Sequence, residues 1–328
     1  MYEAFFGLRE RPFDLSPDSR FLFLAASHQE ALSNLDYGLS ARKGVTLLIG
    51  EAGMGKTTLV RAVLASYRKR DALCVYLNNP TLTRSEFLRF IANEFGLPPA
   101  AATDKVTCLR ELEAVLLRRA EAGQISALLI DEAQSMPHEL LEEVRLLANM
   151  ETDTTKLLPL ILAGQPELAG RLNDPSLRQL KQRIALRCEL KPFDLGRTAA
   201  YIATRIRTAG GEAARVFTRE AVIRIHEASQ GIPRVISVIC DNALVAGFAA
   251  GASPISSRLV EEVCRDFDLQ KQTPPEPPVK AESMFSDEEP AEPSAADEGI
   301  AAGAADHHTV TEPQLFGDYS RRRRMSFF

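Results

Sequence analysis

The sequence predicts an α/β fold with a parallel five-stranded sheet, followed by a smaller all-helical domain and a tail. Short apolar runs alternate with longer segments of helical periodicity, which is the pattern of a parallel sheet with crossover helices. A glycine-rich stretch between the first run and its helix fits the pattern of a phosphate-binding P-loop. After the fifth run, four helical segments are expected without strands between them, at about residues 196–209, 218–229, 233–249 and 256–267, with Pro233 in the first turn of the third. The five expected strands are residues 45–49, 73–77, 127–130, 158–163 and 184–190.

Length and composition are ordinary for a soluble globular protein. The chain has 328 residues, 45% of them apolar and 25% charged, which is enough for about two domains. The net charge of −5 lies in the last 58 residues, which hold six of the 39 basic and eleven of the 44 acidic side chains. Residues 1–270 are therefore neutral overall. They give no whole-domain basic footprint for nucleic acid, although a local basic patch is compatible with them.

The sequence contains no sign of export or of a membrane span. The five cysteines are scattered and none forms a C-x-x-C pair, as expected for reduced thiols inside the cell. No apolar run approaches the roughly 18 residues that a membrane helix needs. Charged residues near the N-terminus replace the apolar region of a signal peptide. We therefore expect a cytoplasmic protein.

The P-loop pattern predicts a site for the phosphates of ATP together with Mg²⁺. A helix follows the loop, so the loop N–H groups and the helix N-terminus would face the phosphates. Lys56 would reach the β- and γ-phosphates, and the Thr57 hydroxyl would bind Mg²⁺. A glycine-rich turn that merely joins strand to helix is the structural alternative. The residues expected around the nucleotide are Gly50, Glu51, Ala52, Gly53, Met54, Gly55, Lys56, Thr57 and Thr58.

An Asp–Glu pair follows the third apolar run. The carboxyl end of a strand is where an open α/β sheet carries its site. Asp131 would hold Mg²⁺, mostly through water, and Glu132 would orient and polarise the attacking water. A solvated strand end is the alternative for such a pair taken alone. One strand lies between this pair and the P-loop, which is the order in P-loop ATPases that have an additional strand and a catalytic glutamate.

Four further side chains are candidates for contact with the γ-phosphate. Gln165 follows the fourth strand and would lie beside that phosphate. Arg178 and Arg183 belong to a basic stretch before the fifth strand, and one of them would act as an arginine finger on a neighbour's ATP. Arg234 lies at a helix start, where the dipole disfavours a cation, so an external phosphate is its expected partner. The alternatives are a turn residue at the first position and solvent-exposed arginines at the others.

These patterns divide the chain into four regions. Residues 1–43 comprise an aromatic-rich segment and a helix, expected to pack on the nucleotide-binding core, and part of the segment is a candidate for the adenine pocket. Residues 44–192 form the nucleotide-binding domain, and residues 193–268 form a helical lid. Residues 269–328 have the composition of a disordered acidic tail. Ser27 is the expected N-cap of the N-terminal helix.

The tail closes with four arginines and, two residues later, two phenylalanines, from Arg321 to Phe328. Such a basic and aromatic end is a candidate for contact with an anionic membrane surface or for docking into a partner. A solubilising or uncommitted terminus is the alternative. A peripheral position at the inner membrane is therefore compatible with a cytoplasmic protein.

Taken together, these motifs resemble those of the ExeA/GspA-like AAA+ ATPases, which include proteins tied to type II secretion, MSHA-type pili and exopolysaccharide or exosortase loci. The resemblance covers about residues 1–268. Its most specific parts are the aromatic opening and the Gly-Gln-Pro-Glu-Leu stretch, because very many proteins share the P-loop. Its carriers are Phe5-Phe6-Gly7-Leu8, Pro12-Phe13, Pro17-Asp18, His28, Tyr37-Gly38-Leu39, the P-loop, Ile130-Asp131-Glu132-Ala133-Gln134, Gly164-Gln165-Pro166-Glu167-Leu168, Leu180 with Gln182-Arg183-Ile184, and Gly231-Ile232-Pro233-Arg234.

The resemblance implies an AAA+ core with a helical lid, homo-oligomers in the form of hexamer-like rings or filaments, and ATP at subunit interfaces. It matches Arg234 to the lid sensor arginine and Gln165 to the strand-end sensor, and it implies partners in envelope export machinery. Full-length ExeA-type proteins look like a cytoplasmic ATPase followed by a membrane span and a periplasmic peptidoglycan-binding domain. This chain shows neither after residue 268, so shorter members of the family are the better comparison.

Three functions are open at this point. The first is an ATPase that couples ATP hydrolysis to the assembly or regulation of a cell-envelope secretion, pilus or exopolysaccharide export system. The second is an ATP-dependent, DNA-binding regulator of transposition, because related AAA+ transposition proteins share the core. The neutral body of the chain disfavours DNA as a partner. The third is a nucleotide-dependent scaffold with negligible turnover.

Overall fold

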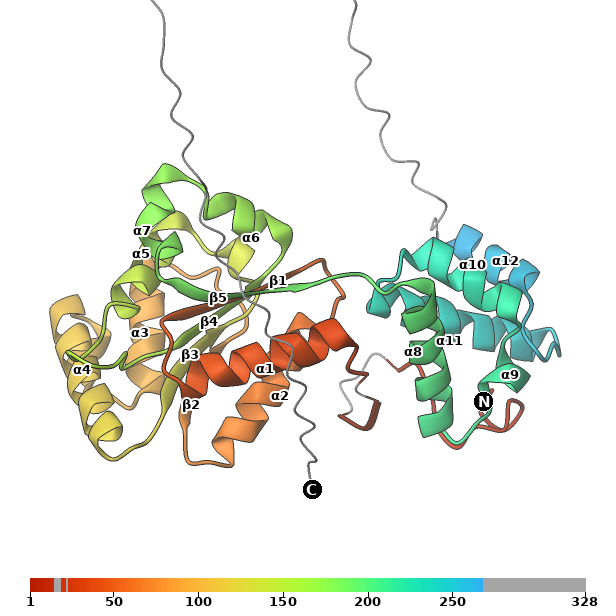
Figure 1. Ribbon diagram of the computed structural model, residues 1–328, viewed down its shortest axis with the longest axis horizontal. Coiled ribbons are helices and arrows are strands. Elements are labelled where there is room, and N and C mark those ends of the chain that lie inside the picture. The colour runs from red at the N-terminus through yellow and green to blue at the C-terminus, as the bar shows by residue number, and fades with distance from the viewer. Residues whose placement is uncertain (15–18, 22, 268–328) are drawn as a thin grey trace, which may run out of the picture. The chain divides into compact units, whose positions relative to one another are not determined.

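The computed structural model describes residues 1–14, 19–21 and 23–267, and Figure 1 shows how their helices and strands are arranged. The expected acidic tail, with its end from Arg321 to Phe328, lies outside the described residues. Within the described part of the chain, no helix is both long enough and apolar enough to cross a bilayer.

The predicted five-stranded parallel sheet is confirmed. Its strands lie in the order β2-β3-β4-β1-β5, and every neighbouring pair is parallel. The end of β1 lies beside the end of β4, because Ile49 pairs with Gly164. The carboxyl ends of the central strands therefore meet at one edge of the sheet. The strands are β1 (Val45–Gly50), β2 (Leu73–Leu77), β3 (Ser126–Ile130), β4 (Leu160–Gly164) and β5 (Ile184–Leu190).

Helices cover both faces of the sheet, and the central strands β1, β3 and β4 are buried on both sides as a parallel sheet requires, whereas the edge strand β5 is partly exposed. Leu47 and Ile49 of β1 join one apolar cluster, whereas Leu48 joins the other. The first cluster contains residues of α3 (Arg84–Glu94), α4 (Lys105–Glu121), α5 (His138–Leu147), α6 (Pro166–Arg171) and α7 (Arg178–Lys181). The second contains residues of α1 (Ala26–Ser40) and α2 (Lys56–Arg68). This alternation fixes which face each strand residue serves.

The helical region after β5 has its own apolar core. Ile206, Ile225 and Ile239 lie in it with no exposed surface. Its helices are α8 (Leu195–Thr208), α9 (Ala213–Val216), α10 (Arg219–Ser229), α11 (Pro233–Ala249) and α12 (Ser257–Asp266). The sequence predicted all of these except the short α9, which has too few residues to show helical periodicity.

The aromatic N-terminal segment packs in that helical core, and not on the α/β core as the sequence analysis expected. Phe6, Phe13 and Phe21 are buried in the same cluster as Tyr201. The backbone N–H of Arg9 donates to Ala209 O at 2.7 Å, which ties the segment to the end of α8. The reason is one of space: α1 to α7 already cover the sheet, whereas the small helical bundle has an apolar side that the segment fills.

The start of α1 also differs from expectation. The helix begins at Ala26, and its N-cap is Ala25, which makes no side-chain cap hydrogen bond. Ser27 lies inside the first turn, and its hydroxyl is buried without a hydrogen-bond partner. Ser27 is therefore not the N-cap that the sequence analysis expected, because the helix begins two residues earlier than that cap requires.

Candidate nucleotide-binding site

The P-loop joins β1 to α2 at the carboxyl edge of the sheet. Gly55 is the N-cap of α2 with φ of 92°, and it offers no side chain to the first N–H groups of the helix. These donors are therefore available to an anion at the helix N-terminus. The loop glycine Gly53 has φ of 81°, a left-handed conformation that other residues rarely adopt.

Lys56 is buried in the loop and is 4% exposed. Its ammonium group donates to Gly50 O at 2.7 Å and to Glu51 O at 3.0 Å. Burial lowers the pKa of Lys56, and nearby carboxylates, Glu132 first among them, oppose that shift. A phosphate bound in the loop would stabilise the charged ammonium more strongly than the two carbonyl groups do.

Thr57 and Asp131, the two predicted Mg²⁺ ligands, meet at the site. The Thr57 hydroxyl donates to Asp131 Oδ2 at 2.6 Å. The same oxygen accepts from the Tyr76 hydroxyl at 3.2 Å, and Oδ1 accepts from the Glu132 N–H at 2.9 Å. A hydroxyl and a carboxylate beside a phosphate site are the hard oxygen donors that Mg²⁺ prefers. The residues present therefore fit a magnesium ion carried by the nucleotide.

Glu132 follows the end of β3 and faces the pocket beside the P-loop. It lines the pocket together with Lys56 and Thr57. Its backbone is left-handed, with φ of 51°, which costs a non-glycine residue roughly 1–2 kcal/mol. Its carboxylate accepts a hydrogen bond from Gln134 Nε2 at 2.6 Å. A carboxylate held at this position can take up a proton from water that attacks a phosphate.

The pocket beside the P-loop has a volume of about 400 Å³ and draws its lining from three parts of the chain. The loop and α2 contribute Gly53 to Thr58. The N-terminal segment, part of which is a candidate for the adenine pocket, contributes Phe21 and Phe23. The helical region contributes aromatic and basic side chains, namely Phe193, Tyr201, Arg205 and Arg234. The three rings of Phe23, Phe193 and Tyr201 lie 5.6 to 5.7 Å apart at their centroids.

Arg234, the candidate for contact with an external phosphate, lies against the P-loop. Its backbone N–H donates to Gly53 O at 3.2 Å, and its side chain lines the pocket. A Cβ on Gly53 would lie 2.8 Å from Arg234 Cβ. The preceding turn is fixed as well, because Phe193 N–H donates to Gly231 O at 2.9 Å and a Cβ on Gly231 would lie 2.0 Å from Phe193 O. Glycine at position 53 permits the close approach of Arg234 to the loop, and glycine at position 231 permits that of the Phe193 backbone to the turn before α11.

His28 and Tyr76 are site residues whose roles the sequence did not reveal. His28 Nε2 lies 2.9 Å from Met54 O, and the ring lines the pocket. His28 was noted only as one carrier of the family resemblance. Tyr76 lies in the middle of β2 and holds the Asp131 carboxylate. In the sequence it is a tyrosine in an apolar run. Nothing near it in the sequence indicates that its hydroxyl contacts Asp131, which follows a different strand.

The structure does not bring Gln165, Arg178 or Arg183 to the lining of the same protomer's pocket. Gln165 is the N-cap of α6, and its N–H donates to the Gln134 side chain at 3.1 Å. Arg183 precedes β5 beside the start of β1, since its carbonyl accepts from Val45 N–H at 3.1 Å. The P-loop follows the other end of β1, about 17 Å along the strand. Arg178 is exposed on α7.

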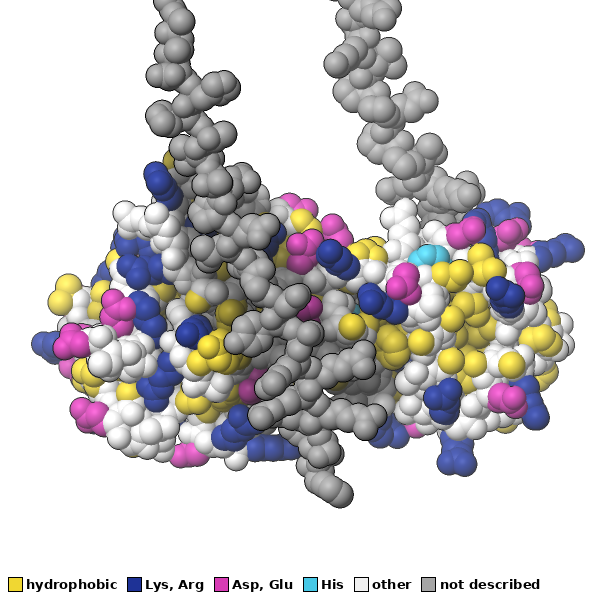
Figure 2. Space-filling model, viewed as in Figure 1, with side chains coloured by type: hydrophobic (Ala, Val, Ile, Leu, Met, Phe, Trp, Pro, Cys, Tyr) yellow, Lys and Arg dark blue, Asp and Glu magenta, His cyan; other side chains and the backbone are white. Residues whose placement is uncertain are grey.

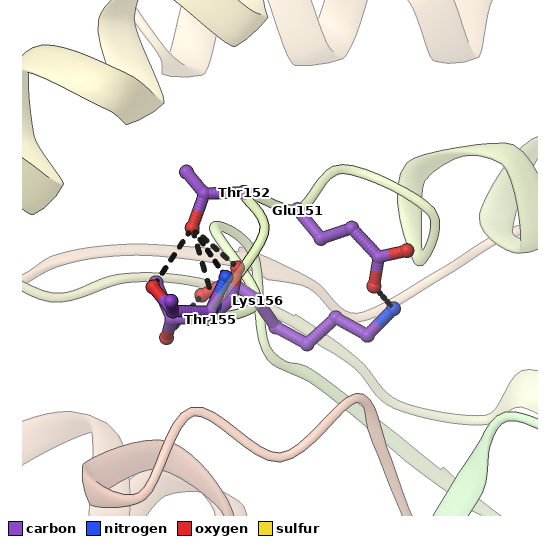
Figure 3. A network of polar contacts seen from close by, with 5 residues as sticks. Glu151, Thr152, Thr155 and Lys156 are labelled. Atoms are coloured by element: carbon purple, nitrogen blue, oxygen red, sulfur yellow. Dashed lines mark hydrogen bonds and ion pairs between the residues drawn. The ribbon is translucent and has the colours of Figure 1, made fainter.

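Arg183 lies close to a compact loop after α5, which Figure 3 shows. Glu151 and Lys156 form an ion pair across the loop, and the Thr152 hydroxyl accepts from Thr155 N–H at 3.2 Å. Lys156 lowers the pKa of Glu151, and the charge of Arg183 contributes in the same direction. Arg183 Nε is buried without a hydrogen-bond partner. This arginine therefore lies at the amino edge of the sheet, away from its own P-loop.

Comparison with known proteins identifies the family. Residues 40–172 match the family described as AAA domain. The chain is 42% identical over 255 residues to general secretion pathway protein A of Aeromonas hydrophila. The chain is a GspA-like member of the AAA family. The alignment covers 78% of this GspA-like chain and 46% of the relative, so the chain spans about half the length of the protein it matches.

Solved structures support the fold of this GspA-like chain. Cdc6p from Pyrobaculum aerophilum matches with a TM-score of 0.59 at 19% identity, over 78% of this chain and 70% of that one. The ORC2 protein of Aeropyrum pernix, solved with ADPNP and ADP, matches with 0.55 at 18% identity, over 78% and 71%. Drosophila ORC bound to DNA matches with 0.57 at 18% identity, over 78% and 64%. At such identities the likeness concerns the fold alone.

Proposed function

We propose that the chain is a Mg²⁺-dependent ATPase that couples ATP hydrolysis to the assembly or regulation of a cell-envelope export machine. One observation supports the enzymatic part of this proposal. Lys56, Thr57 and Glu132 line one pocket, and the Thr57 hydroxyl donates a hydrogen bond to Asp131. The relative named for general secretion supports the export part. The ATP that such an enzyme consumes is cytoplasmic, and we place its catalytic domain there.

In the proposed reaction the residues of the chain have separate tasks. The loop N–H groups and Lys56 bind the phosphates, and the aromatic lining receives the base. Thr57 and Asp131 would hold Mg²⁺, which supplies positive charge to the phosphate oxygens. Glu132 orients the attacking water and accepts its proton. Gln165 and Arg234 respond to the γ-phosphate from the strand end and from the lid.

A homo-oligomer completes this scheme. Arg178 and Arg183 do not line the pocket of their own subunit, so we expect either to serve as a finger on the ATP of a neighbour. A finger of this kind neutralises charge in the transition state. We therefore propose a ring or filament in which each pocket is completed by the adjacent copy, with export-machine proteins as further partners.

The alternative of a transposition regulator gains no support. The curated relative is named for secretion. On the face of the molecule seen in Figure 2, Lys and Arg side chains are interspersed with Asp and Glu. A surface of mixed sign gives weak, salt-sensitive attraction to a phosphate backbone. The proposed contact of Arg321–Phe328 with a membrane surface concerns residues outside those that the structure describes.

Phosphate release from ATP by the purified protein tests the enzymatic proposal. Lys56→Ala should abolish both binding of a fluorescent ATP analogue and turnover, because the phosphates lose their buried cation. Glu132→Gln should still bind the analogue, but its kcat should fall by about 10²–10⁴. Lys69→Ala is the matched control, since Lys69 is exposed at the other end of the same helix. Turnover by the wild type no faster than by Lys56→Ala would refute the ATPase.

The export role has a separate test in cells. The wild-type gene is replaced by Lys56→Ala or Lys69→Ala at the same expression level. Only Lys56→Ala should block assembly of the export machine, because only that variant loses ATP binding. Normal export with Lys56→Ala would refute the coupling, whatever the ATPase assay shows.

A further inference from the structure

Both the nitrogen and the oxygen of the Gln134 side-chain amide form hydrogen bonds, and one of the partners is Glu132. Gln134 lies two residues after Glu132, in a short 3-10 turn of residues Ala133–Ser135. Its Nε2 donates to Glu132 Oε2 at 2.6 Å. Its Oε1 accepts from the backbone N–H of Gln165 at 3.1 Å. The amide therefore connects the carboxylate after β3 to the first residue after β4.

The chemistry of these partners fixes the orientation of the amide. A backbone N–H can only donate, so the atom facing Gln165 must be the amide oxygen. The NH₂ group must then face Glu132, whose ionised carboxylate can only accept. A flipped amide would oppose donor to donor and oxygen to oxygen. The hydrogen bond to Glu132 is thus imposed by the fold rather than by the choice of a rotamer.

The backbone of Gln134 is also hydrogen-bonded by a residue of the region that follows β4. Arg171, at the end of α6, donates from Nη1 to Gln134 O at 2.6 Å. A Cβ on Gly164 would lie 3.1 Å from Gln134 Oε1, so the amide packs directly against the end of β4. Two anchors from the β4–α6 region therefore set the position of Gln134. Any movement of that region is transmitted to the group that holds Glu132.

We infer that Gln134 is the positioning residue for Glu132 during ATP hydrolysis. By donating to Oε2, the amide leaves Oε1 of Glu132 to accept the proton of the attacking water. It also limits rotation of a carboxylate that sits on a left-handed backbone. The inference rests on the proposed ATPase function. It adds that the general base is aligned by a residue that contacts neither nucleotide nor metal.

Three variants separate positioning from a structural role. Gln134→Ala removes both hydrogen bonds of the amide. Gln134→Glu keeps the shape and the acceptor for Gln165 N–H but replaces the donor to Glu132 by a like charge. Gln124→Ala is the matched control, because Gln124 also donates its amide to a carboxylate, Asp71 Oδ2 at 2.7 Å, but before β3 at the opposite edge of the sheet.

The test measures steady-state ATP turnover, the Kd of a fluorescent ATP analogue and the Tm of each full-length variant. Both Gln134 variants should lose about 10- to 100-fold in kcat, since a misplaced reacting group has a cost of that size. The Kd of the analogue should stay near the wild-type value, because positioning of the base contributes to the transition state and not to ground-state binding. Gln124→Ala should keep both kcat and Kd.

The outcomes distinguish this inference from the function on which it rests. A wild-type protein without turnover refutes the ATPase itself. An active wild type with an equally active Gln134→Ala refutes the positioning role alone. Parallel losses of kcat, analogue binding and Tm in both Gln134 variants also overturn it, because they indicate a residue needed only for folding. A fall in kcat alone in both variants supports it.

Discussion

At the scale of single residues, His28 shows how a buried ring holds the nucleotide loop. Its Nε2 lies 2.9 Å from the Met54 carbonyl, so the neutral ring donates from that nitrogen. Its Nδ1 is buried and has no hydrogen-bond partner. Burial lowers the pKa of His28, and the charge of Arg197 acts in the same direction, against a smaller opposing effect of the bond to Met54.

This arrangement predicts a loss of stability in mild acid. The unfolded chain takes up a proton at the ordinary histidine pKa of about 6.5, whereas folded His28 resists protonation. The stabilising contribution of the neutral ring is therefore fully present above the unfolded pKa. It is lost as the pH falls toward the lower folded value. His28→Gln, whose amide can still donate to Met54, should show a smaller fall in Tm between pH 8 and pH 5 than the wild type.

Both proteins share every other titrating group, so the comparison of the two Tm shifts isolates His28. Parallel pH dependence in wild type and variant would show that His28 does not titrate between the two states.

Among the site residues, the sequence revealed those that belong to a local motif. Lys56, Thr57 and the Asp131–Glu132 pair were predicted because a loop, a helix start and a strand end are each readable from neighbouring residues. The roles of His28, Tyr76 and Gln134 were not predicted. Tyr76 and Asp131 are 55 positions apart, and no spacing rule relates such residues. Their roles depend on which strands pair, and only the fold supplies that.

At the scale of secondary-structure elements, the P-loop contacts the start of α11, because Arg234 N–H donates to Gly53 O. Gly53 has a left-handed backbone and no room for a Cβ beside Arg234. Gly123, after α4, is also left-handed, with φ of 72°, but a Cβ there would meet nothing within 4 Å. Comparing alanine substitutions at Gly53 and Gly123 therefore distinguishes the cost of backbone strain from the cost of steric contact with Arg234.

Gly123→Ala should lower the free energy of unfolding by about 1 kcal/mol and leave nucleotide binding unchanged. Gly53→Ala should cost more and should also weaken binding of an ATP analogue, because either the loop or Arg234 must move. Chemical denaturation and analogue titration measure the two effects. Equal analogue affinity in both variants would contradict the proposed tight contact of loop and lid.

Elements with strong local patterns were predicted well, and those decided by tertiary packing were not. The expected helix 233–249 is α11 as found, with proline in its first turn as the sequence indicated. The start of α1 was predicted at the wrong residue, because Ala25 is the N-cap and Ser27 already lies in the first turn. The aromatic segment was assigned to the wrong core, since an apolar pattern shows that a segment is buried but not against which partner.

At the scale of the whole molecule, the shared pocket proposed above makes a prediction about mixed oligomers. Glu132→Gln lacks the base in its own pocket but retains its arginines. Arg183→Ala, or Arg178→Ala, retains its pocket but lacks a candidate finger for the neighbour. Mixing the two kinds of subunit should restore ATP turnover above that of either alone, because some interfaces then combine an intact pocket with an intact finger.

The arginine whose variant is both inactive alone and rescued by mixing is the finger. Arg183 is half-buried near Glu151, whereas Arg178 is exposed, so the two differ in how much reorientation each needs. Absence of rescue with both arginine variants would refute completion of the pocket by a neighbour. The parallel five-stranded sheet was predictable from the sequence, but the choice of finger was not, because it depends on a surface that meets a second copy.

The packing of the N-terminal aromatic segment into the helical core has a consequence for synthesis on the ribosome. The segment leaves the ribosome before its partners on α8 to α12, which lie more than 160 residues later in the chain. At about 5–20 residues per second, the aromatic rings wait on the order of 10 s or longer before those partners exist. The strands of the sheet are complete before that time has passed, whereas the helical core and the aromatic lining that it gives to the pocket form only after α8 to α12 have been made. Competence to bind ATP therefore marks a chain that has been translated through nearly all of its described length.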